Sequence, residues 1–298
     1  MADVERIKAR LHNIRSVEPI LGAMRTISLG SWQAALNRQG RLRLFSRRLL
    51  SLLPPVLAHL HKRRRKRALG SSHARQSIFL IVGSERGLCG AFNRNLVHYV
   101  QGQLDEWQTR DREVALWVFG SRARRMLERA EAPIAWFEPL PTTKLPGREL
   151  VVDLVNGWLE QYEAFELDTV YVLYNAYRNS TLYESVMVRL IPPDLPSAEL
   201  SAEPSAIAWP PPYVDTDPVS LYTRIVRLWT TTEMYRLLLD SAAAEHSTRF
   251  QLMEGATQNS NRLINELTLA LQSARQTAIT SEMQELAVGA GLVGGGEE

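Results

Sequence analysis

Residues 219–288 repeat apolar or small side chains every three or four positions, and no proline follows Pro218. The mean step of about 3.5 residues is the heptad step of a coiled coil. A helix of about 70 residues is roughly 100 Å long, so it must extend beyond any compact domain and needs a partner along its stripe. The predicted stripe comprises Leu221, Ile225, Leu228, Thr232, Tyr235, Leu239, Ala242, His246, Arg249, Met253, Ala256, Ser260, Leu263, Leu267, Ala270, Ala274 and Ala278.

The N-terminal segment carries the same repeat and supplies the partner. Pro54 and Pro55 are expected to stop this helix at about Leu53, and Pro19 is expected to kink it or loosen a turn. With a domain between the two helices, the pattern predicts a long antiparallel coiled coil of the N- and C-terminal helices. The N-terminal stripe comprises Val4, Ile7, Leu11, Ile14, Val17, Leu21, Met24, Ser28, Ser31, Ala35, Arg38, Leu42, Phe45, Leu49 and Leu52.

Residues 77–195 have a different pattern, in which short apolar runs alternate with helical segments. Strands are expected at 77–82, 114–118, 168–174 and 183–190, with helices at 91–107, 121–129 and 148–162. This alternation predicts a Rossmann-like α/β domain with a largely parallel sheet. The expected organisation is an N-terminal coiled-coil helix at 1–60, a basic linker at 61–76, the α/β domain at 77–195, a proline-rich tether at 196–218, a C-terminal coiled-coil helix at 219–288 and a flexible tail at 289–298.

The charge of the chain is unevenly distributed. Residues 1–75 hold 17 Lys and Arg but three acids, a net of +14, although the whole chain carries only +3. Such segregation suggests an acidic partner, which could be nucleic acid, lipid headgroups or an acidic protein, or else a solvated helix face. The run 62–67 is interpreted as an exposed linker, because no aromatic residues are interleaved for base stacking. The charged N-terminus does not resemble a secretory signal.

The loop from Gly83 to Gly90 stands between an expected strand and an expected helix, where phosphate-binding loops occur. It lacks both the Gly-Lys-Ser/Thr ending of a P-loop and the Gly-x-Gly-x-x-Gly order. We therefore expect Gly87, Cys89 and Gly90 to form a structural turn, with no cofactor and no metal. Cys89 is the single cysteine and has no identifiable histidine partner, so a packing role is favoured over a nucleophilic one.

Three blocks resemble the gamma subunit of F-type ATP synthases, in the same order and places. The first leads from Arg10-Leu11 to Ala23-Met24-Arg25-Thr26-Ile27, and the second is Ser84-Glu85-Arg86-Gly87-Leu88-Cys89-Gly90 with Asn93. The third and most specific extends from Ser241 to Ala290 and includes 274–283, Ala-Arg-Gln-Thr-Ala-Ile-Thr-Ser-Glu-Met. Pro19, and Gly22 in place of the usual lysine, depart from the pattern and are typical of a divergent or alternate lineage.

The resemblance implies a non-catalytic rotor subunit of the central stalk, which transmits rotation between the ion-driven membrane ring and the catalytic ring. It implies the alpha and beta subunits, epsilon and the c-ring as partners, with no nucleic acid and no direct small-molecule substrate. It implies a peripheral location on the cytoplasmic face of the bacterial inner membrane, and it leaves proton and sodium coupling both open. The coupling contacts to the beta subunit that it implies are Arg275, Gln276, Thr280, Glu282, Met24 and Arg25.

Two rival functions remain open at this point. The basic N-terminal part is also typical of a coiled-coil protein that binds DNA or RNA. The α/β domain is also compatible with a Rossmann-like enzyme carrying helical dimerisation arms. A steep salt-dependent shift with duplex DNA would support the first, and tight nucleotide binding by the isolated chain would support the second.

Overall fold

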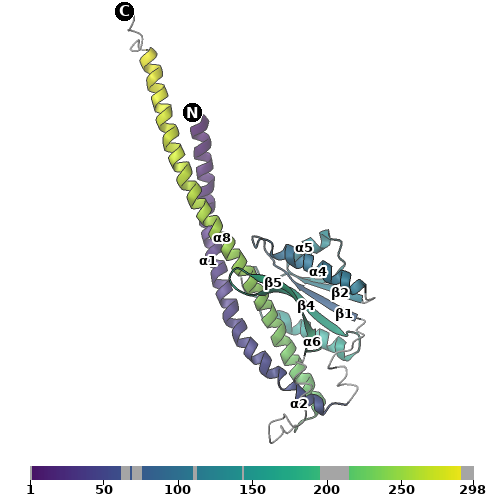
Figure 1. The fold of residues 1–298 in the computed structure, drawn as a ribbon. Helices are drawn as coiled ribbons and strands as arrows, with labels where there is room; N and C mark the ends of the chain where they lie inside the picture. The colour runs from purple at the N-terminus through teal and green to yellow at the C-terminus, as the bar shows by residue number, and fades with distance from the viewer. Residues whose placement is uncertain are drawn as a thin grey trace, which may run out of the picture. The chain divides into compact units, whose positions relative to one another are not determined.

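The computed structural model describes residues 2–61, 68, 76–109, 113–142, 144–194 and 215–289. The chain divides into two compact units: Ser28–Arg249 forms one, and Met1–Ile27 together with Phe250–Glu298 forms the other. Two long helices, α1 (Ala2–Leu50) and α8 (Pro218–Gly289), each contribute residues to both units (Figure 1). The fold is therefore mixed α/β with long terminal helices, as the sequence pattern predicts.

The larger unit contains a five-stranded sheet in the order β3-β2-β1-β4-β5. The first four strands of this order are mutually parallel, and β5 pairs antiparallel with β4. This topology confirms the predicted Rossmann-like domain with a largely parallel sheet. The strands are β1 (Gln76–Val82), β2 (Glu113–Phe119), β3 (Ile134–Glu138), β4 (Thr169–Tyr177) and β5 (Tyr183–Ile191).

Helices cover both faces of this sheet, which explains the uninterrupted apolar run of β1. Ile78, Leu80 and Val82 belong to one core cluster, whereas Phe79 and Ile81 belong to the other. Side chains that alternate along a strand face opposite sides of the sheet, so both faces must be apolar when both are buried. The first cluster includes residues of α2 (Leu53–Ala58), α6 (Glu149–Glu163) and α8, and the second includes residues of α4 (Phe92–Gln108) and α5 (Ser121–Arg129).

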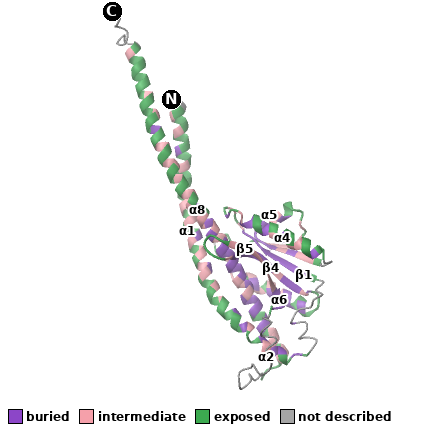
Figure 2. Cartoon of the chain, viewed as in Figure 1, coloured by how far each residue is buried: buried purple, intermediate pink, exposed green. Residues whose placement is uncertain are grey.

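Helix α8 is therefore part of the core as well as of a helix pair. Beside the sheet it is largely buried (Figure 2). Met234, Leu237 and Leu238 are almost completely inaccessible to solvent. Its beginning is well defined, because the Asp217 carboxylate accepts hydrogen bonds from the backbone nitrogen and the hydroxyl of Ser220, both at 2.8 Å. An aspartate before the first turn and a proline as its first residue are a favourable helix start.

The two long helices pair antiparallel within the larger unit through polar as well as apolar residues. Gln39 Nε2 donates to Asp240 Oδ1 at 2.9 Å, and Ser46 Oγ donates to Glu233 Oε2 at 2.6 Å. From the first contact to the second, the residue number rises by seven on α1 and falls by seven on α8, as an antiparallel pair requires. Within the smaller unit, the Arg25 guanidinium binds the Glu254 carboxylate at 2.7 Å across the same two helices.

Several details of the predicted helices are wrong. Helix α1 ends at Leu50, and Pro54 and Pro55 open the short helix α2 instead of ending α1. Proline fits the first turn of a helix because its missing N–H is not needed there. Pro19 lies inside α1, which is continuous from Ala2 to Leu50, and the predicted kink or loosened turn at Pro19 stays a prediction. The heptad pattern places Arg38 and Phe45 on the stripe that faces α8, but both residues are exposed. Gln39 and Ser46 face α8 instead, because a helix with 3.6 residues per turn drifts against a 3.5-residue repeat.

The strand β3 is an addition to the predicted elements, and the domain boundaries in the linkers remain predictions. Residues 62–67 and 69–75 of the expected basic linker, 195–214 around the proline-rich tether and 290–298 of the expected tail lie outside the described residues. Gly289 itself is the last residue of α8 rather than the first of a tail.

Candidate functional site

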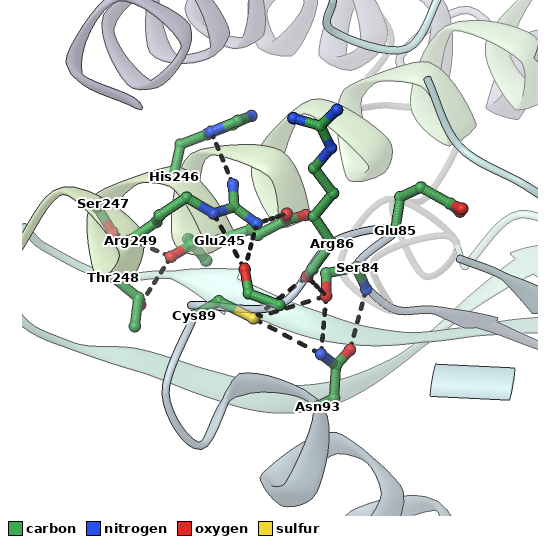
Figure 3. A network of polar contacts seen from close by, with 12 residues as sticks. Ser84, Glu85, Arg86, Cys89, Asn93, Glu245, His246, Ser247, Thr248 and Arg249 are labelled. Carbon is green, nitrogen blue, oxygen red and sulfur yellow. Dashed lines mark hydrogen bonds and ion pairs between the residues drawn. The ribbon is translucent and has the colours of Figure 1, made fainter. Parts of the chain in front are cut away.

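The site begins where the loop after β1 meets α8. Residues 83–91 connect β1 to α4, and they contact the turn of α8 from Glu245 to Arg249, all within the larger unit (Figure 3). We call this contact the joint. It brings Gly87 and Cys89, two predicted turn residues, next to Arg249, which the heptad pattern placed only on the helix seam.

Hydrogen bonds within the loop fix its conformation. The Asn93 side chain accepts from the Ser84 backbone nitrogen at 3.0 Å and donates to the Ser84 hydroxyl at 2.7 Å. That hydroxyl donates to the carbonyl of Arg86 at 2.7 Å. The thiol of Cys89 is buried among these groups, with its sulfur 3.5 Å from Ser84 Oγ and 3.6 Å from Asn93 Nδ2. The predicted packing role of Cys89 agrees with this position.

Two glycines of this loop suit their positions because they have no side chain. Gly90 has a φ of 57°, which favours glycine. A Cβ on Gly83 would lie 2.2 Å from the Cβ of Ala123, so β1 and α5 can approach this closely only because Gly83 has none. Leu88, between them in sequence, has a φ of 60° and a largely exposed side chain, an unfavourable backbone conformation for leucine.

A carboxylate occupies the end of α5 where a phosphate could otherwise bind. Glu85 accepts hydrogen bonds from the backbone nitrogen and hydroxyl of Ser121 at 3.0 and 2.5 Å, and from the Leu140 nitrogen at 3.0 Å. Burial opposes the charged form, but these hydrogen bonds prevail and lower the pKa of Glu85. Because a helix N-terminus favours one negative charge, Glu85 fills that role itself.

On the α8 side, Arg249 holds the joint together. Its Nε and Nη2 both donate to the carbonyl of Gly87 at 3.3 Å, and it forms an ion pair with Glu245 one turn earlier on α8. Its Nη1 lies 3.2 Å from His246 Nδ1. The Ser241 hydroxyl adds a hydrogen bond of 3.4 Å to the carbonyl of Val82 at the end of β1. Thus α8 is fixed to the sheet by directional contacts as well as by apolar burial.

The ionisable groups of the joint are arranged for structure and not for proton transfer. Burial raises the pKa of Glu245, although the Arg249 charge opposes the shift. Burial and the same Arg249 charge lower the pKa of His246 to about 4, so its imidazole is neutral and can accept the hydrogen bond from arginine. Burial also raises the pKa of the Cys89 thiol, which keeps it protonated and therefore a poor nucleophile.

The predicted coupling residues lie in the smaller unit, away from the joint in sequence. Arg275, Gln276 and Glu282 are exposed on α8, and the hydroxyl of Thr280 donates to the Gln276 carbonyl at 2.9 Å. The hydrogen bond from Lys8, the charge of Lys8 and, to a smaller extent, the charge of Arg275 lower the pKa of Glu5 on α1. Arg275 is thus exposed but close enough to α1 to affect its first turn.

The two predicted coupling residues on α1 are less accessible. Met24 and Arg25 are half-buried, and Arg25 is already engaged by Glu254 on α8. The structure places these residues on the helix pair, but it brings none of them to the joint. Glu245 and Arg249 are functional candidates that the sequence analysis did not select, and the signal available was a charged residue on an otherwise apolar seam.

Comparison with known proteins gives the family. A profile of the ATP synthase family matches residues 3–291. The chain belongs to the ATP synthase gamma family. It is 27% identical to the ATP synthase gamma chain of Pasteurella multocida (strain Pm70) and 28% identical to that of Glaesserella parasuis serovar 5 (strain SH0165). Both alignments cover 98% of this chain and 100% of the relative.

The fold agrees with this family. A chain from the cryo-EM structure of the Euglena gracilis mitochondrial ATP synthase (OSCP/F1/c-ring, rotational state 3) aligns with a TM-score of 0.63 at 13% identity, covering 100% of this chain and 98% of that one. A chain from the Tetrahymena thermophila mitochondrial ATP synthase, central stalk/c-ring, aligns with a TM-score of 0.56 at 19% identity, covering 80% and 99%.

Family membership makes the chain the non-catalytic rotor-stalk subunit of an ATP synthase. It does not support the alternative of a basic nucleic-acid-binding protein. Such a subunit is a peripheral part of a membrane complex. Within the described residues, no helix combines the length and apolar character needed to cross a bilayer.

Proposed function

We propose that α8 transmits torque from the α/β domain to a catalytic ring of alpha and beta subunits. The joint fixes α8 to the α/β domain, and the exposed C-terminal part of α8 contacts the ring. The observation that carries this proposal is the change in environment along this one helix. Met234 and Leu238 are buried in the core, whereas Met283 and Leu286 are about two-thirds exposed or more, at 68% and 72%. Large apolar residues exposed near a helix end indicate a surface for a partner.

The proposed partners and location are supported by the family and by the related complexes, which contain F1, the central stalk and the c-ring. The α/β domain contacts epsilon and the c-ring, and the helix pair lies inside the ring of alpha and beta subunits. The subunit is peripheral, on the cytoplasmic face of the bacterial inner membrane. ATP chemistry belongs to the ring, so this chain alone neither hydrolyses ATP nor binds it tightly. Enzyme-like turnover by the purified chain, free of alpha and beta, would contradict this proposal.

The coupling contacts are the most specific part of the proposal. Arg275 and Gln276 bind a loop of the beta subunit, with Thr280 and Glu282 close by and Met24 and Arg25 contributing from α1. Arginine and glutamine carry several hydrogen-bond donors that fit carboxylates or backbone carbonyls. A rotor biases the sites around it only through contacts that differ between their conformations. Loss of an arginine–carboxylate contact costs on the order of 1–3 kcal/mol, and this cost falls on the conformation that makes the contact.

The test is the double variant Arg275→Ala with Gln276→Ala in the assembled complex. We expect ATPase activity and ATP-driven ion pumping to fall several-fold, while assembly stays intact because the buried seam is unchanged. The matched control is Arg262→Ala with Gln258→Ala, which removes the same side-chain types from exposed positions earlier on α8. Parental rates in the assembled Arg275/Gln276 variant, or an equal loss in the control, would remove these two residues from the proposal.

A further inference from the structure

A cavity of about 510 Å³ lies in the larger unit between α1, α8 and the antiparallel strands β4 and β5. We call it the basic cleft, because five arginines and three carboxylates line it. Its volume is within the range of small-molecule sites. The arginines are Arg43 and Arg47 from α1, Arg178 and Arg189 from the strand region, and Arg236 from α8.

Two of the three carboxylates in the basic cleft accept hydrogen bonds from donors on α1, α8 and β4. Glu233 accepts from Arg236 at 2.6 and 3.0 Å and from Ser46 at 2.6 Å. Asp240 accepts from Gln39 at 2.9 Å and from the Tyr174 hydroxyl at 3.1 Å. Burial raises the pKa of Asp240, although the Arg236 charge opposes the shift.

The third carboxylate and the remaining strand arginines are also paired. Asp194 binds Arg189 at 2.6 Å, and Arg178 binds Glu184 through two nitrogens at 3.0 and 2.8 Å. Within the described residues, Arg189 Nε is buried without a hydrogen-bond acceptor. Each carboxylate of the cleft therefore already has a hydrogen-bond donor or an arginine as partner. The unused hydrogen-bond donors of the cleft belong to arginine side chains.

Two arginines are left without a counter-charge. In the part of the chain that the structure describes, Arg43 and Arg47 have no carboxylate at ion-pair distance. They are four residues apart on α1, so they lie on one face of the helix, and both line the cleft. Guanidinium groups match phosphate oxygens with paired hydrogen bonds, which a lysine cannot reproduce.

We propose that the basic cleft binds a small phosphorylated anion carrying two or more negative charges, held by Arg43 and Arg47 from the α1 side. This site is independent of the coupling residues and of the joint. Because its walls come from both long helices and from the sheet, a bound anion would connect α1 to the β4–β5 side of the domain. Its phosphate could come from a soluble polyphosphate compound or from a lipid headgroup, and the experiment separates these sources.

The test uses the full chain, inorganic pyrophosphate as the probe and 0.15 M KCl to suppress diffuse charge effects. Calorimetric titration should show saturable binding of one pyrophosphate per chain, and the melting temperature should rise with pyrophosphate. Arg43→Gln with Arg47→Gln should weaken binding at least tenfold. The control Arg41→Gln with Arg48→Gln removes the same charge from the same helix outside the cleft and should change binding less than twofold.

The two phosphate sources are separated with vesicles of phosphatidylcholine with or without phosphatidic acid. Flotation with phosphatidic acid vesicles that is lost in the Arg43/Arg47 variant identifies a lipid headgroup, and pyrophosphate binding without flotation identifies a soluble anion. Either result supports the site. The proposal is overturned if pyrophosphate and vesicles both fail to bind, if the two double variants weaken binding equally, or if only a polyglutamate peptide binds. Circular dichroism of each variant verifies that α1 is folded.

Discussion

Replacement of Arg249 by alanine tests whether the joint is held by its ion pair. The Arg249 side chain is 7% exposed and that of Glu245 is 14% exposed. Removal of the guanidinium deletes both hydrogen bonds to the Gly87 carbonyl and leaves the Glu245 charge buried without its partner. Breaking a buried ion pair from one side costs about 3–5 kcal/mol, because the remaining charge is desolvated and unpaired.

The predicted loss should depend on pH in a definite direction. Burial already raises the folded-state pKa of Glu245, and Arg249 opposes that shift. A carboxyl whose pKa is raised by folding binds its proton more tightly in the folded state, so stability falls as pH rises from the unfolded to the folded pKa. Without Arg249 the folded pKa rises further. The variant should therefore be most destabilised near neutral pH, and its difference from the parent should shrink on acidification.

The assay is urea unfolding of the full chain between pH 5 and 8, followed by circular dichroism. Glu245→Gln with Arg249→Met removes both charges while retaining much of their volume, and it should recover most of the stability lost in the single variant. Arg262→Ala is the control, since its pair with Glu266 is exposed and should contribute at most about 0.5 kcal/mol. A cost below about 1 kcal/mol for Arg249→Ala, or a cost independent of pH, would refute this account of the joint.

Three further predictions concern other contacts. Gly83→Ala should destabilise the chain by about 1–3 kcal/mol or more, because the new Cβ would lie 2.2 Å from a side chain of α5. Gly102→Ala, whose new Cβ would meet nothing within 4 Å, should instead stabilise α4 by up to about 1 kcal/mol. Thermal unfolding of the two variants measures both changes. Arg25→Glu should weaken the helix pair at low salt, and adding Glu254→Arg should restore it; equal effects at 1 M salt would contradict an ionic contact. Cys89→Ser should leave the response of the complex to dithiothreitol unchanged, because an internal disulfide needs a second cysteine and the chain has one.

Periodicity predicted those elements whose residues repeat in a strong local pattern. The strand before Gly83 is apolar on both faces, and the heptads up to Leu267 follow positions that are mostly buried or half-buried. Beyond Leu267 the predicted Ala270 is exposed and Leu271 is buried in its place, whereas the predicted Ala274 and Ala278 are half-buried. The strand β3 has only five residues and a single neighbouring strand, so its sequence Ile-Ala-Trp-Phe-Glu carries a weak signal.

The joint and the polar seam could not be predicted in the same way, because they depend on residues far apart in the chain. Gly87 and Arg249 are separated by 162 positions, and Gln39 and Asp240 by 201. An apolar pattern assigns polar residues to the solvent side by default, whereas Ser46 and Asp240 are buried because they satisfy polar groups across the interface. Only the family resemblance indicated that the loop and the long helix belong to one functional unit.

A helix that transmits torque must resist sliding and rotation relative to the domain that drives it. Apolar packing is strong but non-directional, so the burial of Met234 and Leu238 alone would allow small shifts along or about the helix axis. Hydrogen bonds and ion pairs require fixed distances and angles, and they are expensive to leave unmade when buried. The contact of Ser241 with the end of β1 and that of Arg249 with the loop after β1 therefore set the register of α8 against the sheet, while its apolar side chains supply most of the stability. Different residues of α8 thus provide the stability of its packing and fix its register against the sheet. Loss of Arg249 should therefore alter the transmission of torque even where the domain still folds.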